Sequence, residues 1–282
     1  MLCSIHSARV DRHQEEERGP PQSLETPDRP NGSAFVPEAV LPPLNASQLR
    51  AACSTCNLRE LCLPMQLSPS DLATVEKLVA TRRKVPRGEA LYRAGDDFDS
   101  LYALRLGFLK STVTSTDGRE QVTGFHMAGE LVGLDGISTQ KHHCDAVALE
   151  NTEVCVIPYE RLEHIASEVP VLQTHFHKVM SREIVREHGV MLLLGSMHAE
   201  ERLAAFLLNL SQRFEARGYS RTEFVLRMTR AEIGSFLGLK LETVSRALSR
   251  FANDGLIEVN QKHLRIADSD GLRAIVSGQT LR

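Results

Sequence analysis

The amino-acid sequence predicts an α+β fold: an N-terminal antiparallel β-roll, then a long helix, then a C-terminal winged helix-turn-helix. Three patterns predict it. Short alternating strands between residues 85 and 158 are separated by glycines, which is typical of a small antiparallel roll. Apolar residues then recur at three- and four-residue steps through residues 171–198. Finally, two short amphipathic helices broken at Gly238 precede two brief strands.

The composition limits the class of protein. With 282 residues and a hydrophobic share of 42%, the chain can form one large or two ordinary domains with real cores. No apolar run approaches the ~20 residues that a membrane span needs, and the polar, Pro-rich start does not resemble a signal peptide. We therefore expect a cytoplasmic protein without a membrane partner. No nucleophile with its base and no phosphate loop is recognisable, which argues against an enzyme.

Charge and chain breakers differ between the two ends of the sequence. Residues 1–45 are expected to form a flexible tail, since prolines and glycines break any periodicity there. The net charge is -3, yet residues 199–282 hold 13 Lys and Arg residues against 10 Asp and Glu residues. This small basic excess lies in the helix-turn-helix part, where it favours a nucleic-acid partner.

A cysteine-rich arm is the most chemically specific segment. Three cysteines lie within ten residues of one another: Cys53, Cys56 and Cys62. In a cytoplasmic chain they are better explained as metal ligands or buried thiols than as disulfides. A fourth metal ligand must come from elsewhere, and Cys144 and Cys155 are the candidates because Cys3 lies in the tail. An iron-sulfur cluster needs four thiolates, whereas zinc also accepts histidine.

Residues 46–168 are expected to form a sensor domain in which the cysteine arm leads into the roll. A short helix capped by the Ser68–Asp71 segment connects the two. The glycines that separate the strands are Gly88, Gly95, Gly107, Gly118, Gly129, Gly133 and Gly136. Such a roll is a container for a ligand or a platform for a partner, and the fold alone does not decide between them.

The long helix, expected over residues 169–198, carries the pattern of a coiled-coil seam. Its apolar positions are Phe176, Met180, Ile184, Met191 and Leu194. Glu187 interrupts this stripe. Either it lies at the edge of the seam, where its carboxylate reaches water, or it faces its own copy across a two-fold axis. At ~6 Å and an effective dielectric of about 20, two such carboxylates oppose pairing by roughly 3 kcal/mol.

Residues 199–275 are expected to form the winged helix-turn-helix. Thr229 and Glu232 fit a capping box that opens a short apolar helix, and Gly238 ends that helix. The next helix has a stripe that is predicted to be buried: Leu241, Val244, Leu248 and Phe251. Two brief strands between residues 256 and 266 form the wing.

The other side of the second helix carries the side chains that favour DNA recognition. In a major groove, Arg246 can donate two hydrogen bonds to guanine, and Glu242 can accept a hydrogen bond from the amino group of cytosine. Ser245 can act as a donor or as an acceptor. Each good pair discriminates between bases by about 1 to 3 kcal/mol. The alternative is an ordinary surface helix on which Glu242 and Arg246 form an ion pair worth roughly 0.3 to 0.5 kcal/mol. Because the capped first helix, the Gly turn and the wing accompany the motif, DNA reading is the favoured interpretation.

This order of arm, roll, long helix and winged helix-turn-helix resembles the family of the catabolite activator protein, whose roll is a cyclic-nucleotide-binding domain. Three features are similar to its oxygen-sensing fumarate and nitrate reduction regulator subfamily. They are the arm cysteines, the run Glu-Glu-Arg-Leu-Ala-Ala-Phe at 200–206 and the run Glu-Thr-Val-Ser-Arg at 242–246. The resemblance covers about residues 50–275.

The resemblance implies a cofactor and a ligand set. In that subfamily three arm cysteines and one roll cysteine hold a [4Fe-4S] cluster, which oxygen destroys. Placed on the family pattern, Cys155 is the fourth ligand beside Cys53, Cys56 and Cys62, and Cys144 is an extra thiol. Transcription regulation that responds to oxygen is the function implied.

The resemblance also implies partners. The cluster is expected to promote homodimerisation through the long helix, with Met180, Ile184, Glu187 and Met191 at the dimer switch. The residues expected to read palindromes with half-sites of the TTGAT type are Glu242, Ser245 and Arg246. RNA polymerase is the further partner that such an activator contacts.

The roll departs from the wider family in one place. Cyclic-nucleotide binders hold the phosphate with an Arg-Ser pair, whereas His142 and His143 stand at the corresponding place here. Neutral imidazoles do not replace a bidentate guanidinium on phosphate, so cAMP is not expected as a ligand. With His126, these histidines suggest haem or metal, but exposed loop residues are the favoured explanation. A regulator of the same family gated by an effector or haem, without an iron-sulfur cluster, is the alternative function.

Overall fold

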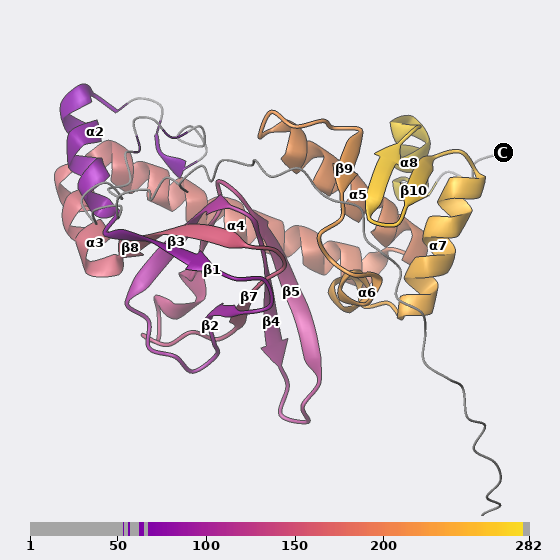
Figure 1. The fold of residues 1–282 in the computed structure, drawn as a ribbon, viewed down its shortest axis with the longest axis horizontal. Coiled ribbons are helices and arrows are strands. Elements are labelled where there is room, and N and C mark those ends of the chain that lie inside the picture. The colour runs from indigo at the N-terminus through magenta and orange to yellow at the C-terminus, as the bar shows by residue number, and fades with distance from the viewer. Residues whose placement is uncertain (1–52, 54–55, 57–61, 65–66, 279–282) are drawn as a thin grey trace, which may run out of the picture. The chain divides into compact units, whose positions relative to one another are not determined.

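The computed structural model describes Cys53, Cys56, residues 62–64 and residues 67–278. The tail predicted at residues 1–45 lies outside the described residues. Figure 1 shows the strands β1 to β8 gathered into one body and the long helix α4 running beside them. The predicted α+β class is confirmed, with the elements in the expected order.

Eight strands form the roll as two antiparallel four-stranded sheets, in the orders β1-β8-β3-β6 and β2-β7-β4-β5. The strands are β1 (Thr81–Val85), β2 (Ala90–Tyr92), β3 (Ser100–Leu106), β4 (Phe108–Thr114), β5 (Glu120–Met127), β6 (Leu131–Val132), β7 (Asp145–Ala148) and β8 (Thr152–Pro158). Leu104, Leu109 and Val154 belong to one buried cluster that joins the two sheets. The roll is thus a packed double layer rather than an open sheet.

Gly107 shows why glycines punctuate the roll. It joins β3 to β4 with φ of +97°, a left-handed conformation that side chains rarely adopt. A Cβ at this position would lie 2.7 Å from the Cα of Thr152. The tight connection therefore requires glycine on both conformational and steric grounds.

Short helices close the ends of the roll. Helix α2 (Pro69–Val75) begins at Ser68, whose hydroxyl accepts a 3.1 Å hydrogen bond from the Asp71 amide, as predicted. The 3-10 helices η3 (Glu76–Leu78) and η4 (Leu134–Gly136) and helix α3 (Tyr159–Glu168) complete this part. A second buried cluster joins Val75 of α2, Leu101 of β3 and Ile165 of α3. This cluster fixes the end of the cysteine arm against the roll.

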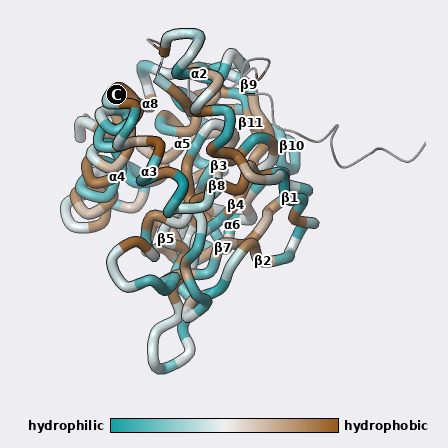
Figure 2. Tube along the Cα trace, turned by 90° about the vertical axis from the view of Figure 1, so that its left-hand side faces the viewer, coloured by the Kyte–Doolittle hydropathy of each residue, from teal (hydrophilic) through white to brown (hydrophobic). Residues whose placement is uncertain are grey.

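Helix α4 (Pro170–Ser196) confirms the predicted long helix. Pro170 occupies its first turn, where a missing N–H costs nothing. Leu172 is the only residue of this helix that is buried within the described part of the chain, and Figure 2 shows apolar and polar residues interleaved along it. Most of its surface is therefore free to contact another molecule.

The C-terminal part forms the winged helix-turn-helix. Its elements are α5 (Ala199–Glu215), β9 (Glu223–Val225), α6 (Arg230–Leu237), α7 (Leu241–Asn253), β10 (Ile257–Asn260), β11 (His263–Ile266) and α8 (Ser269–Val276). The capping box of Thr229 and Glu232 is present, and Gly238 ends α6 with φ of +64°. The wing has a third strand that sequence patterns did not predict, because β9 pairs with β11 in the order β10-β11-β9.

Side chains also connect the roll to the helix-turn-helix. Lys110 of β4 lies 3.2 Å from a carboxylate oxygen of Glu232, and the Val122 amide donates a 2.9 Å hydrogen bond to the hydroxyl of Ser235. The ring centroids of Phe125 and Phe236 lie 5.3 Å apart. Glu232 therefore caps α6 locally at Thr229 and also contacts Lys110 of the roll.

We expect Gly234→Ala to destabilise the protein by about 1 to 3 kcal/mol, since a Cβ there would meet the Leu239 carbonyl oxygen at 2.6 Å. This oxygen belongs to the backbone of the turn, so relief requires the two helices to separate. Urea unfolding measures the loss. Gly189→Ala in α4 is the matched control, because nothing lies within 4 Å of its added methyl group. That control is expected to stabilise the helix by up to about 1 kcal/mol. Equal midpoints for both variants would contradict a tight turn.

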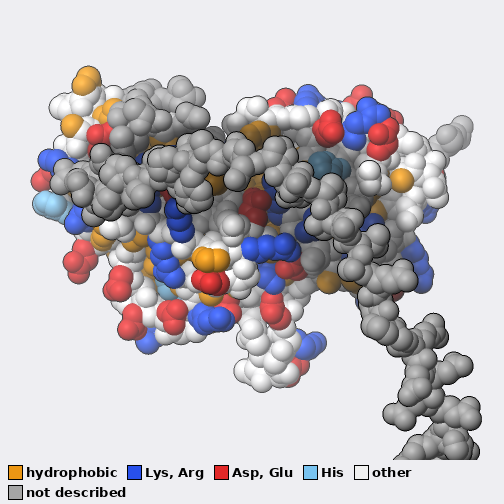
Figure 3. All heavy atoms as spheres, viewed as in Figure 1, with side chains coloured by type: hydrophobic (Ala, Val, Ile, Leu, Met, Phe, Trp, Pro, Cys, Tyr) orange, Lys and Arg blue, Asp and Glu red, His pale blue; other side chains and the backbone are white. Residues whose placement is uncertain are grey.

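No helix among the described residues is long and apolar enough to cross a membrane. On the face in Figure 3, acidic and basic side chains are interspersed. Charge of one sign therefore does not dominate that face, and a candidate site has to be located from individual side chains.

Candidate functional site

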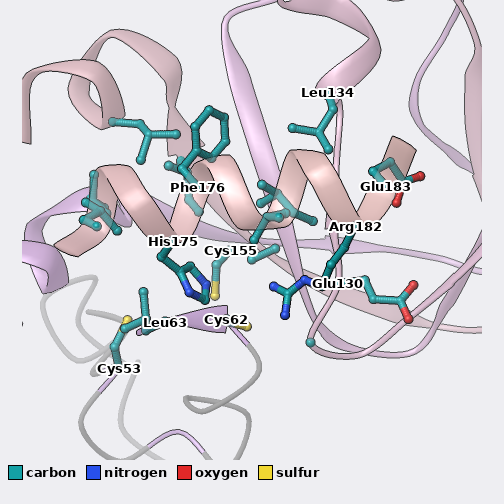
Figure 4. A pocket seen from close by; sticks show the side chains of 18 of the residues that line it. Cys53, Cys62, Leu63, Glu130, Leu134, Cys155, His175, Phe176, Arg182 and Glu183 are labelled. Atoms are coloured by element: carbon teal, nitrogen blue, oxygen red, sulfur yellow. The ribbon is translucent and has the colours of Figure 1, made fainter. Parts of the chain in front are cut away.

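The four cysteines predicted as ligands line one cavity of about 420 Å³. Cys53, Cys56 and Cys62 come from the arm, whereas Cys155 comes from β8, where it is paired with residues of β1 and β3. Figure 4 shows the side chain of Cys155 pointing from the sheet toward Cys53 and Cys62. The structure therefore places residues that are almost a hundred positions apart around one space.

The cysteine thiols interact electrostatically with one another. Burial is the main reason why the pKa of Cys53 is raised to about 11 and that of Cys62 to about 12, and it also raises the pKa of Cys155. The next contribution to the first two comes from the other cysteines, and every pair among the four interacts in this way. These three thiols are therefore protonated at neutral pH, and a metal that binds here must displace their protons.

The donor set fits an iron-sulfur cluster in chemistry. Four thiolates are what such a cluster needs, and four cysteines line the same cavity. A buried nitrogen, Nε2 of His175, has no hydrogen-bond partner among the described residues and belongs to a side chain that lines the cavity. Within the described residues, no three His, Cys, Asp or Glu side chains already stand close enough to hold a metal ion. Binding therefore requires the arm cysteines to draw together.

Cys144 lies apart from the cavity. Its sulfur is 3.4 Å from a carboxylate oxygen of Asp135, and its side chain also hydrogen-bonds with Tyr92. Burial, followed by the charge of Asp135, raises its pKa to about 12. Cys3 lies outside the described residues. Between the two roll cysteines that sequence patterns left open, only Cys155 lines the cavity with the arm cysteines.

A partly buried ion cluster borders the same cavity, and no sequence pattern predicted it. Glu130, between β5 and β6, accepts hydrogen bonds of 2.7 Å from Arg213 of α5 and 2.5 Å from Arg217, which lies just after the end of that helix. Arg186 of α4 lies 3.8 Å away. Burial alone would raise the pKa of Glu130, but the arginine charges outweigh it and lower the pKa. One carboxylate thus joins the roll, α4 and α5.

The dimer-switch residues lie on α4 with much of their surface exposed. Ile184 is 57% and Met191 61% exposed, Met180 is partly buried, and the Glu187 side chain is 50% exposed. The carboxylate of Glu187 is 3.9 Å from Arg186 of its own helix. Exposed apolar residues seven positions apart are typical of a helix that pairs with another helix. The structure of one chain leaves this face without a partner among the described residues.

Helix α7 presents the predicted DNA-reading side chains outward. Glu242 and Arg246 are exposed, and Ser245 is partly buried with its hydroxyl 3.3 Å from Arg230. Among the residues that the structure describes, neither Glu242 nor Arg246 has a hydrogen bond or ion pair. The alternative, an ion pair between these two residues, is therefore not formed. Both charges remain available to a ligand outside the chain.

Leu241 corrects the predicted buried stripe of α7. Val244, Leu248 and Phe251 are at most 3% exposed, as expected, but Leu241 is 47% exposed. It is the first residue of the helix and lies outside the core cluster. Ala247 belongs to that cluster instead. Periodicity assigns a face of a helix, but it does not say where along the axis the core ends.

Two histidines of the roll correct another expectation. His126 and His142 are only 8% and 3% exposed, whereas His143 is exposed as expected of a loop residue. Burial is the main cause that lowers the pKa of His126 to about 3, so its ring is neutral. Its Nε2 lies 2.7 Å from the hydroxyl of Ser111. The sequence did not reveal that position 126 falls on the inner face of β5.

His142 fills the interior of the roll. Its ring stacks on Tyr92 with centroids 3.6 Å apart, and its Nδ1 is 3.4 Å from a carboxylate oxygen of Asp135. These contacts engage the ring within the protein itself. The side chain is therefore part of the packed core and not a free donor for a ligand.

Comparison with known proteins agrees with this architecture. Residues 82–168 match the cyclic nucleotide-binding domain, and residues 201–275 match the Crp-like helix-turn-helix domain. The transcriptional activator protein FnrA of Stutzerimonas stutzeri is 46% identical over 232 residues, which cover 82% of this chain and 95% of that protein. The fumarate and nitrate reduction regulatory protein of Salmonella typhimurium is 43% identical over 223 residues, 79% of this chain and 89% of that protein.

A solved structure is similar along most of its length. The structure of FixK2 from Bradyrhizobium japonicum has a TM-score of 0.65 and is 30% identical, and the similarity covers 70% of this chain and 98% of that chain. The two chains therefore share the same fold over most of the FixK2 structure.

Proposed function

The chain belongs to the Crp/FNR family of transcription regulators, which bind DNA as homodimers and are not enzymes, and we propose that it is an oxygen-responsive activator in the cytoplasm. In this proposal Cys53, Cys56, Cys62 and Cys155 hold a [4Fe-4S] cluster. The observation that carries it is the single cavity that these four side chains line.

The protein's own residues give the arm its two states. Without metal, the raised pKa values of Cys53 and Cys62 keep their thiols protonated, so no metal-thiolate bond connects the arm to the roll. A bound cluster supplies oxygen-labile iron-thiolate bonds between the arm and β8. The arm is therefore fixed to the sheet in one state and held more weakly in the other.

Helix α4 is the element through which the two states of the arm affect pairing with a second copy. Positions 172, 175, 176, 179, 182, 183 and 186 of α4 line the cavity and recur at helical spacing, whereas Ile184 and Met191 lie on the far side of the helix and Glu187 lies at the border. The arm thus borders one side of the helix, and a second copy pairs with the other. A fixed arm favours the helix position in which two copies associate despite their Glu187 charges.

Helix α7 reads the DNA in this proposal. Glu242, Ser245 and Arg246 contact base edges in half-sites of the TTGAT type, and two copies of α7 stand about one helical turn apart on a palindrome. RNA polymerase is the partner that the bound dimer activates. Cyclic nucleotide is not expected to bind, which agrees with the packing of His142 against Tyr92 inside the roll.

The test is to purify the full chain without oxygen and then admit air. We expect brown protein that contains iron and acid-labile sulfide, sediments as a dimer and binds a TTGAT palindrome. On exposure to air, the visible absorbance, the dimer and specific DNA binding should decline together. A colourless dimer that contains zinc in both atmospheres would refute the proposal, and so would DNA binding that persists after all iron is lost.

A further inference from the structure

A two-residue linker connects the dimer helix to the helix-turn-helix. Helix α4 ends at Ser196, Met197 follows it, and His198 is the N-cap of α5. Met197 and His198 have extended backbone, with ψ of 148° and 166°. Because extended residues interrupt the helical hydrogen-bond ladder, the angle between α4 and α5 has to be fixed by other contacts.

Arg202, in the first turn of α5, spans this linker. Its Nη2 donates a 2.8 Å hydrogen bond to the carbonyl oxygen of Leu194, in the last turn of α4. Its Nε donates a 2.9 Å hydrogen bond to the carbonyl oxygen of Met197 in the linker. Two nitrogens of one planar guanidinium thus hold the end of the dimer helix to the start of α5.

The same guanidinium reaches the turn of the helix-turn-helix. Its Nη1 donates a 3.0 Å hydrogen bond to the carbonyl oxygen of Leu237, the last residue of α6. A Cβ at Gly238, the next residue, would lie 3.3 Å from this nitrogen. The last carbonyls of a helix have no partner within the helix and carry the negative end of its dipole. One cation therefore binds the C-terminal ends of α4 and α6 together.

These hydrogen bonds restrict an angle that apolar packing leaves adjustable. Leu193 of α4 packs against the hydrophobic cluster of the helix-turn-helix, but apolar contacts are not directional, whereas a hydrogen bond fixes direction and distance. The donors of an arginine stand in a rigid planar fork. Three carbonyls held by one fork therefore have little freedom to move relative to one another.

We propose that Arg202 is a positioning residue that fixes the angle between the dimer helix and the DNA-reading unit, and thereby sets the spacing between the two half-sites that a dimer accepts. This inference rests on the proposed function, because it assumes pairing along α4 and a palindromic site. With α4 of each copy at the two-fold axis, the angle at each linker decides where each α7 stands. One base pair added between half-sites moves them apart by about 3.4 Å and rotates them by roughly 35°.

Four full-length proteins, purified without oxygen, test this role: the parent, Arg202→Ala, Arg202→Lys and Arg221→Ala. Lysine keeps the charge but lacks the fork that reaches three carbonyls. Arg221→Ala is the matched control, since it removes a half-exposed guanidinium whose partner, Glu215, lies at the opposite end of α5. Fluorescence anisotropy measures binding to the TTGAT palindrome, to the same palindrome with one base pair added or removed between the half-sites, and to a duplex with one half-site.

The expected result is a loss of spacing discrimination in Arg202→Ala. The parent and Arg221→Ala should bind the altered spacings at least about tenfold more weakly than the palindrome, equivalent to about 1.4 kcal/mol. Arg202→Ala should bind all three spacings within about threefold of one another, because engagement of the second half-site no longer depends on one fixed angle. Arg202→Lys should lie between them. Binding to the single half-site and the monomer-dimer dissociation constant should match those of the parent.

Hydrogen exchange provides a measurement that needs neither cluster nor DNA. In metal-free protein, mass spectrometry follows the backbone amides of residues 193–199. We expect exchange there to be about tenfold faster in Arg202→Ala than in the parent, because the hydrogen bonds that hold the linker closed are lost. Arg221→Ala should exchange at the rate of the parent.

The outcomes are separable from those of the proposed function. Spacing discrimination that survives in Arg202→Ala overturns the inference. An equal loss of binding to the single half-site also overturns it, because Arg202 would then only support the fold of the DNA-reading unit, and so does weaker dimerisation. Parent protein that does not bind the palindrome as a dimer refutes the proposed function instead. In that case hydrogen exchange decides, and equal rates in the parent and Arg202→Ala overturn the role of Arg202 at the linker.

Discussion

Cys155→Ser is expected to leave the anaerobic protein without its visible absorbance, mostly monomeric and unable to bind its palindrome specifically. Cys155 is the only cysteine of the roll that lines the cavity, so its loss removes the sole thiol that can connect the arm to β8. A serine hydroxyl does not ionise at neutral pH and is a poor substitute for a thiolate ligand. A change from 99:1 to 1:99 in the dimer population corresponds to about 5.5 kcal/mol.

Cys144→Ser is the matched control for that variant. Both cysteines belong to the roll and both are partly buried, but Cys144 contacts Asp135 and Tyr92 instead of the cavity. Sulfide content, sedimentation and DNA binding should therefore stay close to those of the parent protein. If Cys144→Ser lost the cluster while Cys155→Ser kept it, the proposed ligand set would be wrong.

Arg246→Ala is expected to weaken binding to a TTGAT palindrome by about ten- to a hundredfold per half-site, since one good bidentate contact to guanine contributes about 1 to 3 kcal/mol. Binding to a scrambled duplex should fall much less. Arg246 is exposed and, within residues 67–278, has no ion pair to lose, so the fold should be unaffected. Fluorescence anisotropy with both duplexes at one salt concentration measures the ratio.

Arg250→Ala controls for the loss of a positive charge from the same helix. Arg250 lies about one turn further along α7, and its guanidinium is engaged by Glu200 at 2.8 Å and Asp254 at 3.8 Å. We expect a small and similar effect on both duplexes. An equal loss on specific and scrambled DNA for Arg246→Ala would identify Arg246 as a phosphate contact instead of a base contact.

Local signals in the sequence predicted much of the fold. The capping boxes, the positive-φ glycines and the helical spacing of α4 and α7 depend on residues within a few positions of each other, so a single sequence reveals them. Strand β9 was not predicted, because no local signal marks it. Its three residues are too few to show alternation, and its pairing with β11 involves residues almost forty positions further along the chain.

The candidate site was only partly predictable. Spacing indicated the three arm cysteines, but the choice of Cys155 over Cys144 depended on family resemblance, and only the fold shows which of them lines the cavity. Glu130 and its arginines carry no local pattern, because each ion pair joins residues more than fifty positions apart. The burial of His126 likewise depends on which face of β5 lies inside the roll, beside Ser111, and no local pattern reveals that face.

The ion cluster at Glu130 has a consequence for protein engineering. Hybrid regulators are commonly imagined as a sensing half from one relative joined to a DNA-reading half from another. Here a single carboxylate from the first half forms ion pairs with two guanidinium groups from the second, and breaking a buried ion pair by removing one partner costs up to about 3 to 5 kcal/mol. A functional hybrid must therefore inherit the acid at 130 and the bases at 213 and 217 together, however well its backbone junction is chosen.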